Sequence, residues 1–400
     1  GIYYPDQDRD GDHVTGALTE TFRIEWDNVQ LYGGFAGTEG ARDERDPVAH
    51  VTVLSGDVDG DDTDDDGNGI AETWADLQGG NAYHVLYLDG ESHEPISGAT
   101  VIDGMTVTAG NGDDAFDGAG LYCAGRGSDH ACSPALADVT FSGNSAYHGG
   151  GMYDDGSDGG ASSPVLMGVT FSGNSAYYGG GGMYDDGNDG GASSPVLADV
   201  AFRDNSAGYG GGMLHACDGA TSSPTLTGVT FSSNSASMFG GGMLSGSCNP
   251  ALTDVMFVGN SATRGGGMAN WSGSPALTGV TFARNFAGPI AGWRGCGGGM
   301  YDTGSPTLTD VTFVDNYSNA IGGGMCNEGT SAGGAGRVLT NVTFVRNSAQ
   351  VGGAMYNGGG DYGLVLTNVT FGDNRATGGG GAMYNDRDDG STSPLLVNCI

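Results

Sequence analysis

Apolar and polar residues alternate with a period of two along short runs of three to five residues, and the same order of runs recurs along most of the chain. A typical unit reads Ser-Pro-x-Leu-Thr-Asp-Val-Thr-Phe-x-x-Asn-Ser-Ala, followed by Gly-Gly-Gly-Met-Tyr. The period of two predicts short β-strands whose Leu, Val, Phe and Met side chains point inward, whereas Thr and Tyr point outward. The glycines and asparagines between the runs predict sharp bends.

The phrase Phe-x-x-Asn occurs nine times, and each copy is followed 8 to 15 residues later by a glycine cluster that ends in Met. A unit of about 25 to 32 residues cannot bury its apolar face alone, so neighbouring units must stack. The sequence therefore predicts an all-β fold, a right-handed parallel β-helix (solenoid) of roughly ten to twelve coils. The pairs are Phe141/Asn144, Phe171/Asn174, Phe202/Asn205, Phe231/Asn234, Phe257/Asn260, Phe282/Asn285, Phe313/Asn316, Phe344/Asn347 and Phe371/Asn374, and the methionines are Met152, Met183, Met213, Met243, Met268, Met300, Met325, Met355 and Met383.

We expect one elongated domain, because a repeat array grows by adding coils to a continuous core. Residues 1–118 are less regular and are interpreted as an N-terminal cap with the first coils, and residues 119–400 as regular repeats. The first residues lack the basic and apolar regions of a signal peptide. Residues 393–400 begin a repeat that does not finish, so we expect either more chain or another subunit at that end.

The charge is strongly acidic: 48 acidic residues face 13 basic ones, all of them arginine, for a formal net charge of -35. Such a surface repels nucleic acid and anionic membranes and attracts cations. No stretch approaches the 18 or more apolar residues of a membrane span. The 80 glycines lack the three-residue period of collagen and so belong to turns.

The alternation of Phe-x-x-Asn with Gly-Gly-x-Met resembles the polymorphic outer membrane protein repeat of chlamydiae, which is also found in many bacterial secreted proteins. The segment 31–39, Leu-Tyr-Gly-Gly-Phe-Ala-Gly-Thr-Glu, is similar to the opening segment of those proteins. The resemblance covers nearly the whole chain, although Met replaces the Ala-Ile or Ala-Leu that follows the glycines in the chlamydial form. It implies a secreted or surface-anchored β-helix, often adhesive and usually without catalytic residues.

Two acidic loops have the spacing of a short calcium-binding loop. Each places oxygen ligands at positions 1, 3, 5 and 7 around a glycine, although the glutamate expected at position 12 is replaced by Ala17 in the first loop and Thr73 in the second. The alternative is a solvated acidic loop without an ion. The predicted calcium ligands are Asp6, Asp8, Asp10 and Asp12 in the first loop and Asp62, Asp64, Asp66 and Asn68 in the second, with Asp57, Asp59 and Asp61 as further ligands of the second site.

A third acidic feature lies in the repeats, where Asp154-Asp155 precedes Asp185-Asp186 by one repeat. Stacking would bring the four carboxylates within about 5 to 8 Å of one another, which is costly without a cation. These four residues are therefore a candidate calcium-bridging site, and the alternative is a mobile, solvated loop.

The seven cysteines indicate an oxidising compartment and hence an extracellular or cell-surface location. Cys217 and Cys248 follow the Met of successive repeats, so stacking brings them within disulfide reach, and Cys123 and Cys132 bracket one loop. A Cys296–Cys326 pairing is weaker. Cys399 occupies an inward position, where a buried free thiol is expected.

Two outward columns remain. Threonine precedes the repeat Phe in seven of nine copies, a pattern used by ice-binding helices but also common on any exposed strand. The position after Met is occupied by more apolar residues than the exposed surface of an isolated soluble protein requires. This column is therefore either covered by the acidic loops or is a contact surface for sugar or protein. The candidate contact residues are Tyr153, Tyr184, Leu214, Leu244, Tyr301, Tyr356 and Tyr384.

The sequence favours an extracellular structural or adhesive protein that binds calcium and contacts another copy of itself, a cell surface or a glycan. The self-contact would form a filament, sheath or surface layer. We predict that it is not an enzyme. The alternative is a polysaccharide lyase or glycoside hydrolase of β-helix fold, for which the best acid/base pair is His148 with Asp154. The chain has no lysine, no Gly-His-Gly and no Arg-x-Lys to support that alternative.

Overall fold

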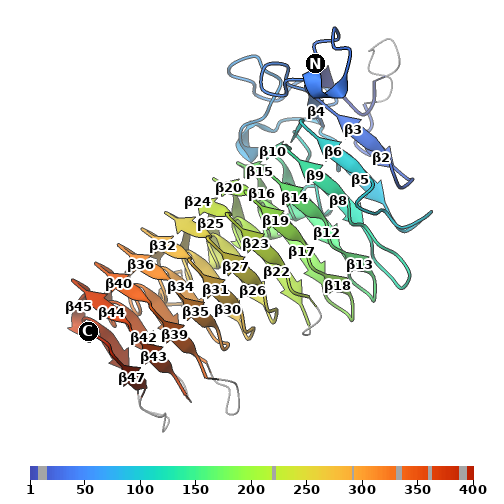
Figure 1. The fold of residues 1–400 in the computed structure, drawn as a ribbon. Coiled ribbons are helices and arrows are strands. Elements are labelled where there is room, and N and C mark those ends of the chain that lie inside the picture. Colours follow the sequence, from blue (N-terminus) through green and yellow to red (C-terminus); the bar gives the residue numbers. More distant parts are fainter. Residues whose placement is uncertain (8–15, 219–221, 291, 330–335, 359–362, 387–393) are drawn as a thin grey trace. The chain divides into compact units, whose positions relative to one another are not determined.

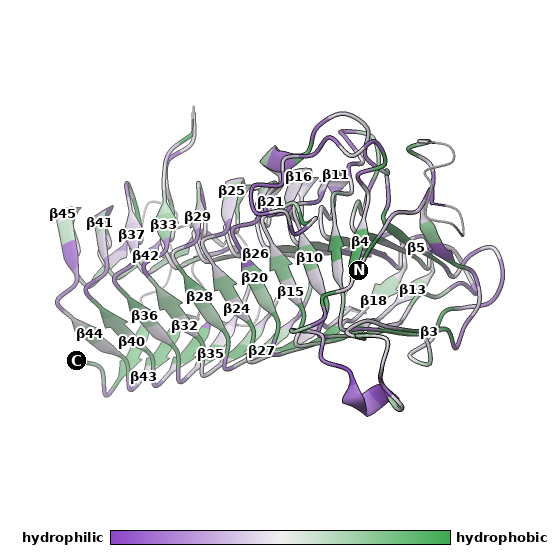
Figure 2. Cartoon of the chain, turned by 90° about the horizontal axis from the view of Figure 1, so that it is seen from above, coloured by the Kyte–Doolittle hydropathy of each residue, from purple (hydrophilic) through white to green (hydrophobic). Residues whose placement is uncertain are grey.

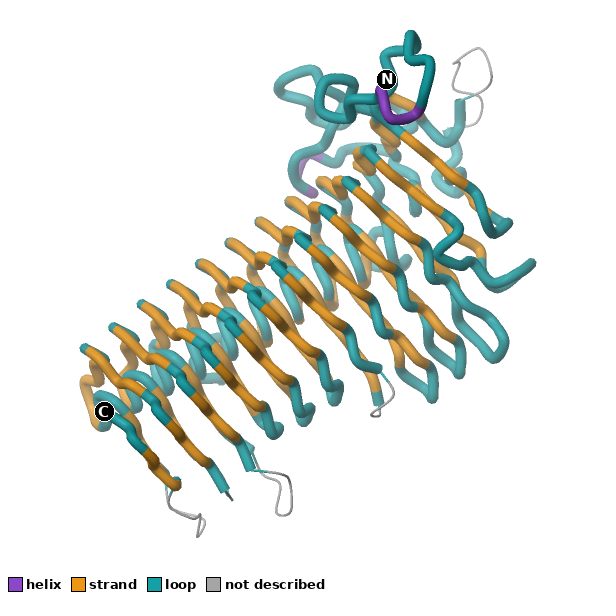
Figure 3. Tube along the Cα trace, viewed as in Figure 1, coloured by secondary structure: helices purple, strands orange, loops and turns teal. Residues whose placement is uncertain are grey.

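The structure is a computed structural model that describes residues 1–7, 16–218, 222–290, 292–329, 336–358, 363–386 and 394–400. The chain divides into two compact units, Gly1–Ser206 and Ala207–Ile400, which we describe in turn. Both are built from short parallel β-strands, and the only helical turns among the described residues are η1 (Arg42–Glu44) and η2 (Trp74–Asp76). The fold is a parallel β-solenoid, as the repeat predicts, and its turns, about nine, roughly match the predicted ten to twelve coils. Strands of successive turns lie side by side and are joined by loops at the corners (Figures 1 and 3).

The first unit contains three long strand ladders and two short ones. The Phe ladder contains β1 (Ile2–Tyr3), β4 (Val53–Ser55), β7 (Thr106–Thr108), β10 (Thr140–Ser142), β15 (Thr170–Ser172) and β20 (Ala201–Arg203). The Met ladder contains β2 (Phe22–Ile24), β5 (Leu86–Asp89), β8 (Leu121–Ala124), β12 (Met152–Asp155) and β17 (Met183–Gly187), and the Leu ladder contains β3 (Gln30–Tyr32), β6 (Val101–Asp103), β9 (Ala135–Ala137), β14 (Val165–Met167) and β19 (Val196–Ala198). In the two short ladders, β11 (Ser145–His148) pairs with β16 (Ser175–Gly179), and β13 (Ala161–Ser162) pairs with β18 (Ala192–Ser193).

The second unit repeats the same three ladders and has one further ladder, and β21 (Ser206–Tyr209) spans the boundary between the units. The Phe ladder contains β24 (Thr230–Ser232), β28 (Met256–Val258), β32 (Thr281–Ala283), β36 (Thr312–Val314), β40 (Thr343–Val345) and β44 (Thr370–Gly372), and the Met ladder contains β22 (Met213–Cys217), β26 (Met243–Gly246), β30 (Met268–Trp271), β34 (Met300–Asp302), β38 (Met325–Asn327), β42 (Met355–Asn357) and β46 (Met383–Asn385). The Leu ladder contains β23 (Thr225–Thr227), β27 (Ala251–Thr253), β31 (Ala276–Thr278), β35 (Thr307–Thr309), β39 (Val338–Thr340), β43 (Val365–Thr367) and β47 (Leu395–Val397). The fourth ladder contains β25 (Ser235–Phe239), β29 (Ser261–Ala262), β33 (Phe286–Ala287), β37 (Tyr317–Ser318), β41 (Ser348–Val351) and β45 (Arg375–Gly379).

The register pairs each residue with its equivalent in the next turn. Phe141 pairs with Phe171, and Met152 with Met183. The repeat Phe and Met side chains are fully buried in eight of nine copies each, and the last of each, Phe371 and Met383, is half-buried. In Figure 2, stacked strands such as β28 and β32 are accordingly coloured green, which marks hydrophobic residues. The predicted inward Phe and Met columns are confirmed.

The repeat asparagines form a buried hydrogen-bonded column, which we call the asparagine ladder. In the second unit, Asn260 Oδ1 accepts from both the backbone N (2.9 Å) and Nδ2 (3.0 Å) of Asn234, and Asn260 Nδ2 donates to Phe231 O (2.9 Å) and Asn285 Oδ1 (3.0 Å). Every polar atom of the amide is therefore used, as burial demands. The repeat asparagines therefore have a structural role in the solenoid.

The corners of each turn require a left-handed backbone. The residue before the repeat Asn has φ of 61° at Gly143 and 56° at Asp204, and the residue before the repeat Val has φ of 54° at Asp254. Glycine adopts this conformation without strain, and asparagine and aspartate tolerate it better than other residues. The bends are therefore encoded locally at each corner.

Candidate functional site

Three carboxylates of the first unit gather in one acidic cluster, Asp57, Asp59 and Asp61. One oxygen from each lies within 4.8 Å of the others, and this is the group of aspartates among the described residues that could hold a metal ion. The backbone places them there, because Asp57 forms an antiparallel bridge with Asn81 and the Gly80 N–H donates to Asp59 Oδ2 (2.8 Å). Oxygen-only ligands of this kind suit a hard cation such as calcium.

The electrostatics of the acidic cluster also favour a cation. Burial, together with neighbouring carboxylates, raises the pKa of Asp57 and of Asp61 above the ordinary value for aspartate. Burial and the charges of Asp57 and Asp61 raise the pKa of adjacent Asp62 to about 6. Like charges held together disfavour ionisation, and a bound divalent cation would reverse that effect.

Asn81 lies beside this cluster, because its backbone pairs with that of Asp57. Its side chain is 2% exposed, and its Nδ2 donates to Asp62 Oδ2 at 2.7 Å. Its Oδ1 is buried and has no hydrogen-bond partner among the described residues. Glycine at position 79 lets the carboxylates of Asp59 and Asp61 approach the backbone closely, because a Cβ there would lie 2.4 Å from Asp61 Oδ2 and 2.7 Å from Asp59 Oδ2. Sequence reasoning missed Asn81, because only the fold brings it beside Asp57.

The predicted second loop is arranged differently from a calcium-binding loop. Asp64 accepts from the backbone of Gly67 (2.8 Å) and Gly69 (2.8 Å), and these bonds lower the pKa of its carboxyl. Asp62 Oδ1 accepts from the Gln78 N–H (2.6 Å), and Asp66 Oδ1 accepts from the Asn68 N–H (3.2 Å). In the described structure, Asp62, Asp64 and Asp66 therefore do not gather around one point.

The first predicted loop lies mainly outside the described residues, which exclude Asp8, Asp10 and Asp12. Asp6 is described and is buried, and its Oδ2 accepts from the Gly16 N–H at 3.2 Å. The calcium hypothesis for this loop remains a prediction.

Asp154 and Asp185 form a buried pair rather than part of a solvated loop. They pair in register between β12 and β17, and both are completely buried. The Ser162 hydroxyl donates to Asp154, and the Ser193 hydroxyl contacts both carboxylates. Burial, followed by the charge of Asp185, raises the pKa of Asp154 well above the ordinary value. The interpretation as a mobile loop is wrong, because β12 continues from Met152 to Asp155 and β17 from Met183 to Gly187, so both aspartates lie within strands.

Asp155 and Asp186 are equally integrated into the fold. Tyr122 donates its hydroxyl to Asp155 Oδ2 and Tyr153 donates to Asp186 Oδ2, both at 2.8 Å. Burial raises the pKa of Asp186. Tyrosine hydroxyls from the neighbouring coil therefore bond to Asp155 and Asp186, two of the four carboxylates proposed as calcium-bridging ligands.

The pairing of His148 with Asp154 is wrong. His148 Nδ1 lies 2.7 Å from Asp117 Oδ1, whereas the Asp154 carboxylate is inside the solenoid. The His148 ring also packs edge-on against Tyr178 and Tyr184, with centroids 5.1 and 4.7 Å away. The nearest candidate acid/base pair is thus His148 with Asp117, a residue that sequence reasoning did not select.

The column after Met is covered, so it does not form the proposed contact surface. Tyr153, Tyr184, Leu214, Leu244, Tyr301 and Tyr356 are 4 to 7% exposed, and Tyr384 is 39% exposed. Tyrosines of adjacent turns stack, with Tyr122 and Tyr153 centroids 5.3 Å apart. Their hydroxyls are used in bonds to aspartate, and His148 lies across the rings of Tyr153 and Tyr184. Of the two alternatives, the structure supports the covered column.

Three disulfides are present among the described residues, and they confirm the two predicted pairs. They are Cys123–Cys132, Cys217–Cys248 and Cys296–Cys326, with Cα separations of 5.6, 5.8 and 5.6 Å. The third is the pairing that sequence reasoning ranked lower. Cys399 is free and half-buried.

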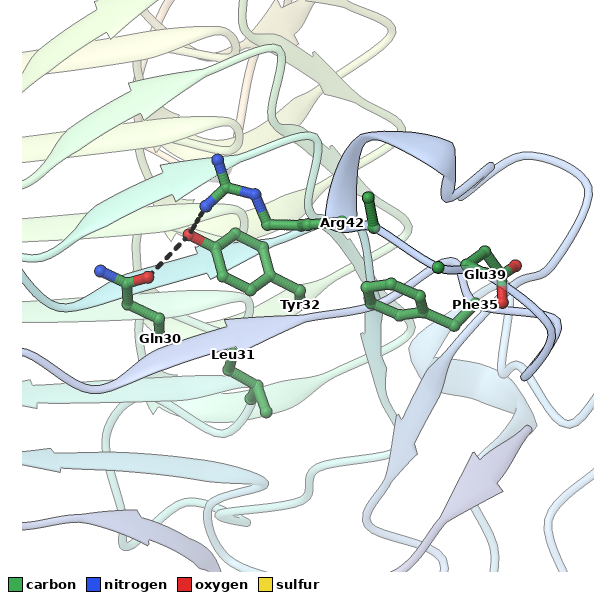
Figure 4. Close-up of a pocket in the computed structure, with 8 residues that line it drawn as sticks. Gln30, Leu31, Tyr32, Phe35, Glu39 and Arg42 are labelled. Atoms are coloured by element: carbon green, nitrogen blue, oxygen red, sulfur yellow. Dashed lines mark hydrogen bonds between the residues drawn. The ribbon is translucent and has the colours of Figure 1, made fainter.

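A pocket beside β3 lies in the segment that resembles bacterial β-helix openings (Figure 4). Arg42 donates to the Tyr32 hydroxyl (2.6 Å), which in turn donates to Gln30 Oε1 (3.1 Å). Glu39 accepts backbone N–H groups, which lower the pKa of its carboxyl. The polar groups of this pocket therefore stabilise its own loop.

None of the protein-family models, curated proteins or solved structures with which the chain was compared matches it. Among the described residues, no helix has the length and apolarity needed to span a membrane.

Proposed function

We propose that this chain is an extracellular structural or adhesive β-solenoid that contacts a macromolecular partner and binds calcium in its first unit. The observation that carries the proposal is the in-register stacking of equivalent residues in the Phe and Met ladders, together with the asparagine ladder, whose buried amides bond to one another. A stacked array of this kind presents extended surfaces. The resemblance to secreted bacterial repeats and the three disulfides support the extracellular location.

Calcium is assigned in this proposal to Asp57, Asp59 and Asp61, with Asn81 Oδ1 as a further ligand. The three carboxylates repel one another in the absence of a cation, and the buried amide oxygen lacks a protein partner among the described residues. The ion would hold segment 57–61 against Gly79 and Gly80. It would also supply the positive charge that the chain, at -35, lacks.

Calcium is expected to raise the melting temperature of the intact protein, and a chelator to lower it. Binding at 100 times the dissociation constant stabilises the folded state by about 2.7 kcal/mol. The double substitution Asp59→Asn with Asp61→Asn should abolish the calcium-dependent shift, as measured by scanning calorimetry. The exposed Asp114→Asn serves as the matched control and should retain it. An unchanged shift in the double variant would place the ion elsewhere, and no shift in wild type would remove calcium from the proposal.

Adhesion to a surface and self-association are both forms of such macromolecular contact. One exposed apolar patch, Val165, Met167 and Val196 on β14 and β19, favours association with a second copy. Sedimentation velocity with and without calcium, compared for wild type and Met167→Gln, tests this. A monomer under both conditions would leave adhesion to a foreign surface as the function.

A second candidate, cleavage of a polysaccharide, is favoured by the pair of His148 and Asp117. Their 2.7 Å contact orients an imidazole beside the tyrosines Tyr147 and Tyr178, where a sugar could stack. If this candidate is correct, incubation with acidic and neutral polysaccharides should release new chain ends, and His148→Gln should abolish the release. Intact polysaccharide with folded wild type would reject it.

A further inference from the structure

The acidic charge is distributed unequally between the two units. Gly1–Ser206 contains six arginines and 37 acidic residues, a formal charge of -31, whereas Ala207–Ile400 contains seven arginines and eleven acidic residues, a formal charge of -4. Between Val255 and Tyr301 there is no aspartate or glutamate, and there are three arginines, Arg264, Arg284 and Arg294. In space, Arg264 and Arg294 both pair with one carboxylate, Glu328, so two positive charges and one negative charge leave a formal charge of +1 in this group. Since the Debye length is about 8 Å at physiological salt, more distant carboxylates affect this group only weakly.

This stretch contains the longest interval between a repeat Asn and its Met, owing to the insertion 288–295, which we call the tryptophan loop. Within it, the Trp293 N–H donates to Ile290 O at 2.8 Å. Described residues on both sides of Ala291 in this loop line an open pocket of about 620 Å³. The pocket is lined by Pro289, Ile290, Gly292, Trp293, Arg294, Asn319, Ala320, Ile321, Gln350 and Val351.

Trp293 is held in place although 44% of it is exposed. The Arg264 guanidinium lies 4.9 Å from its ring centroid, and Phe239 packs edge-on against it at 6.4 Å. Arg264 is itself fixed, because it donates to the Tyr301 hydroxyl (2.8 Å) and pairs with Glu328 (3.1 Å). An exposed indole that is rigidly supported is suited to binding, since little side-chain entropy is lost on contact.

Arg294, next to Trp293, is available to a ligand. Its side chain is 58% exposed, and its closest ion-pair partner, Glu328, is 3.8 Å away and already pairs with Arg264 at 3.1 Å. Two guanidinium groups thus share one carboxylate. Asn319 and Gln350 add amide groups to the pocket, although Asn319 Oδ1 already accepts from the Gly295 N–H (3.1 Å).

We propose that this pocket binds an anionic sugar residue of an acidic polysaccharide. The indole of Trp293 packs against the apolar C–H face of the sugar ring, the guanidinium of Arg294 pairs with its carboxylate or sulfate, and Gln350 hydrogen-bonds its hydroxyls. Arg264 is a positioning residue, because its contacts support Trp293. The inference rests on the proposed adhesive function and specifies the ligand class of that function.

The test is isothermal titration calorimetry of the intact protein with hyaluronan oligosaccharides, which carry carboxylates, and with dextran sulfate, which carries sulfates. Maltooligosaccharides are the uncharged control. A chelator is present throughout, so that calcium bridging cannot contribute. We expect at least one acidic ligand to bind at least tenfold more tightly than the neutral one, with an affinity that falls as salt is raised.

Trp293→Ala and Arg294→Gln should each weaken binding about tenfold or more, and Arg294→Gln should also reduce its salt dependence. Trp26→Ala and Arg203→Gln replace exposed residues of the same types in the first unit and should bind as wild type does. Melting curves of each variant confirm folding. Any one of three results would overturn the inference. They are equal binding of charged and neutral ligands, unaltered binding by folded Trp293→Ala, and no binding at millimolar concentration.

The proposed function can survive that failure. If the wild-type protein adheres to surfaces while the acidic sugars do not bind, the contact surface lies elsewhere on the solenoid. If neither surface adhesion nor self-association occurs, the proposed function itself fails. The two experiments use separate readouts, so their outcomes are distinguishable.

Discussion

Asn260→Ala is expected to lower the free energy of unfolding by about 3 to 5 kcal/mol, a large fraction of the stability of an ordinary domain. The substitution removes four hydrogen bonds made by one buried amide. It also leaves the Asn234 N–H and the Phe231 carbonyl buried without those partners. Each such orphan costs about 1 to 3 kcal/mol. Urea denaturation monitored by circular dichroism measures the loss.

The second unit offers a matched control in an exposed asparagine row. Asn368 Nδ2 donates to Asn341 Oδ1 at 3.1 Å, and Asn398 Nδ2 lies 3.3 Å from Asn368 Oδ1, all at the surface. Because water replaces these bonds, Asn368→Gly, which also permits the local φ of 55°, should change stability by no more than about 1 kcal/mol. Equal losses in the two variants would show that the buried ladder contributes nothing beyond an ordinary surface contact.

The Phe, Met and Asn columns were predictable because their information is local and repeated. A fixed order of residues within each unit, stacked on itself, places Phe257 against Phe282 and Asn260 against Asn285 with no further assumption. The disulfide Cys217–Cys248 follows from the same stacking, and Cys123–Cys132 follows from the two cysteines that bracket one loop. In a solenoid, contacts between distant residues become contacts between equivalent positions.

The inner polar column could have been predicted but was missed. When the period-two alternation is continued, the second residue after each of the first eight repeat Met is a polar residue that points inward, and these eight residues are 0 to 3% exposed. Assigning Asp154 to a loop stopped the alternation too early, and this error produced the wrong pairing with His148. The column comprises Asp154 and Asp185 in the first unit, and His215, Ser245, Asn270, Asp302, Asn327 and Asn357 in the second.

The acidic cluster shows where local spacing is insufficient. The residues Asp62, Asp64 and Asp66 have calcium-loop spacing, yet nearby N–H groups occupy their oxygens. Asn81 and Gly79 reach the neighbouring cluster only because segments 56–58 and 80–82 pair. No periodicity in this irregular region predicts that pairing. The non-repeating part of the chain is therefore the part whose chemistry needed the structure.

Asp154→Asn is expected to stabilise the protein at neutral pH and to remove part of its dependence on pH. The Ser193 hydroxyl carries one proton but contacts Asp154, Asp185 and the Ser162 carbonyl, so acceptors outnumber donors in this dry interior. A proton on Asp154 supplies the missing donor, which agrees with its raised pKa. An asparagine amide supplies N–H donors there at every pH.

The direction in which wild-type stability changes with pH follows from the raised pKa of Asp154. Below about pH 4, the ordinary value for aspartate, both folded and unfolded states hold the proton, so the site costs no stability. As the pH rises, the unfolded chain releases the proton first, and wild-type stability falls until the folded pKa is passed. Asp154→Asn should therefore gain about 1.4 kcal/mol relative to wild type for each unit by which the folded pKa exceeds the unfolded one.

Melting temperatures of wild type and Asp154→Asn between pH 4 and 8 measure this difference. Asp199→Asn, at an exposed corner with φ of 54°, is the matched control and should follow the wild-type curve. Other carboxyls with raised pKa, such as Asp57 and Asp302, contribute equally to all three proteins and cancel in the comparison. Parallel curves for Asp154→Asn and wild type would mean that the buried pair is charged in the folded state, and a cation would then be required to balance it.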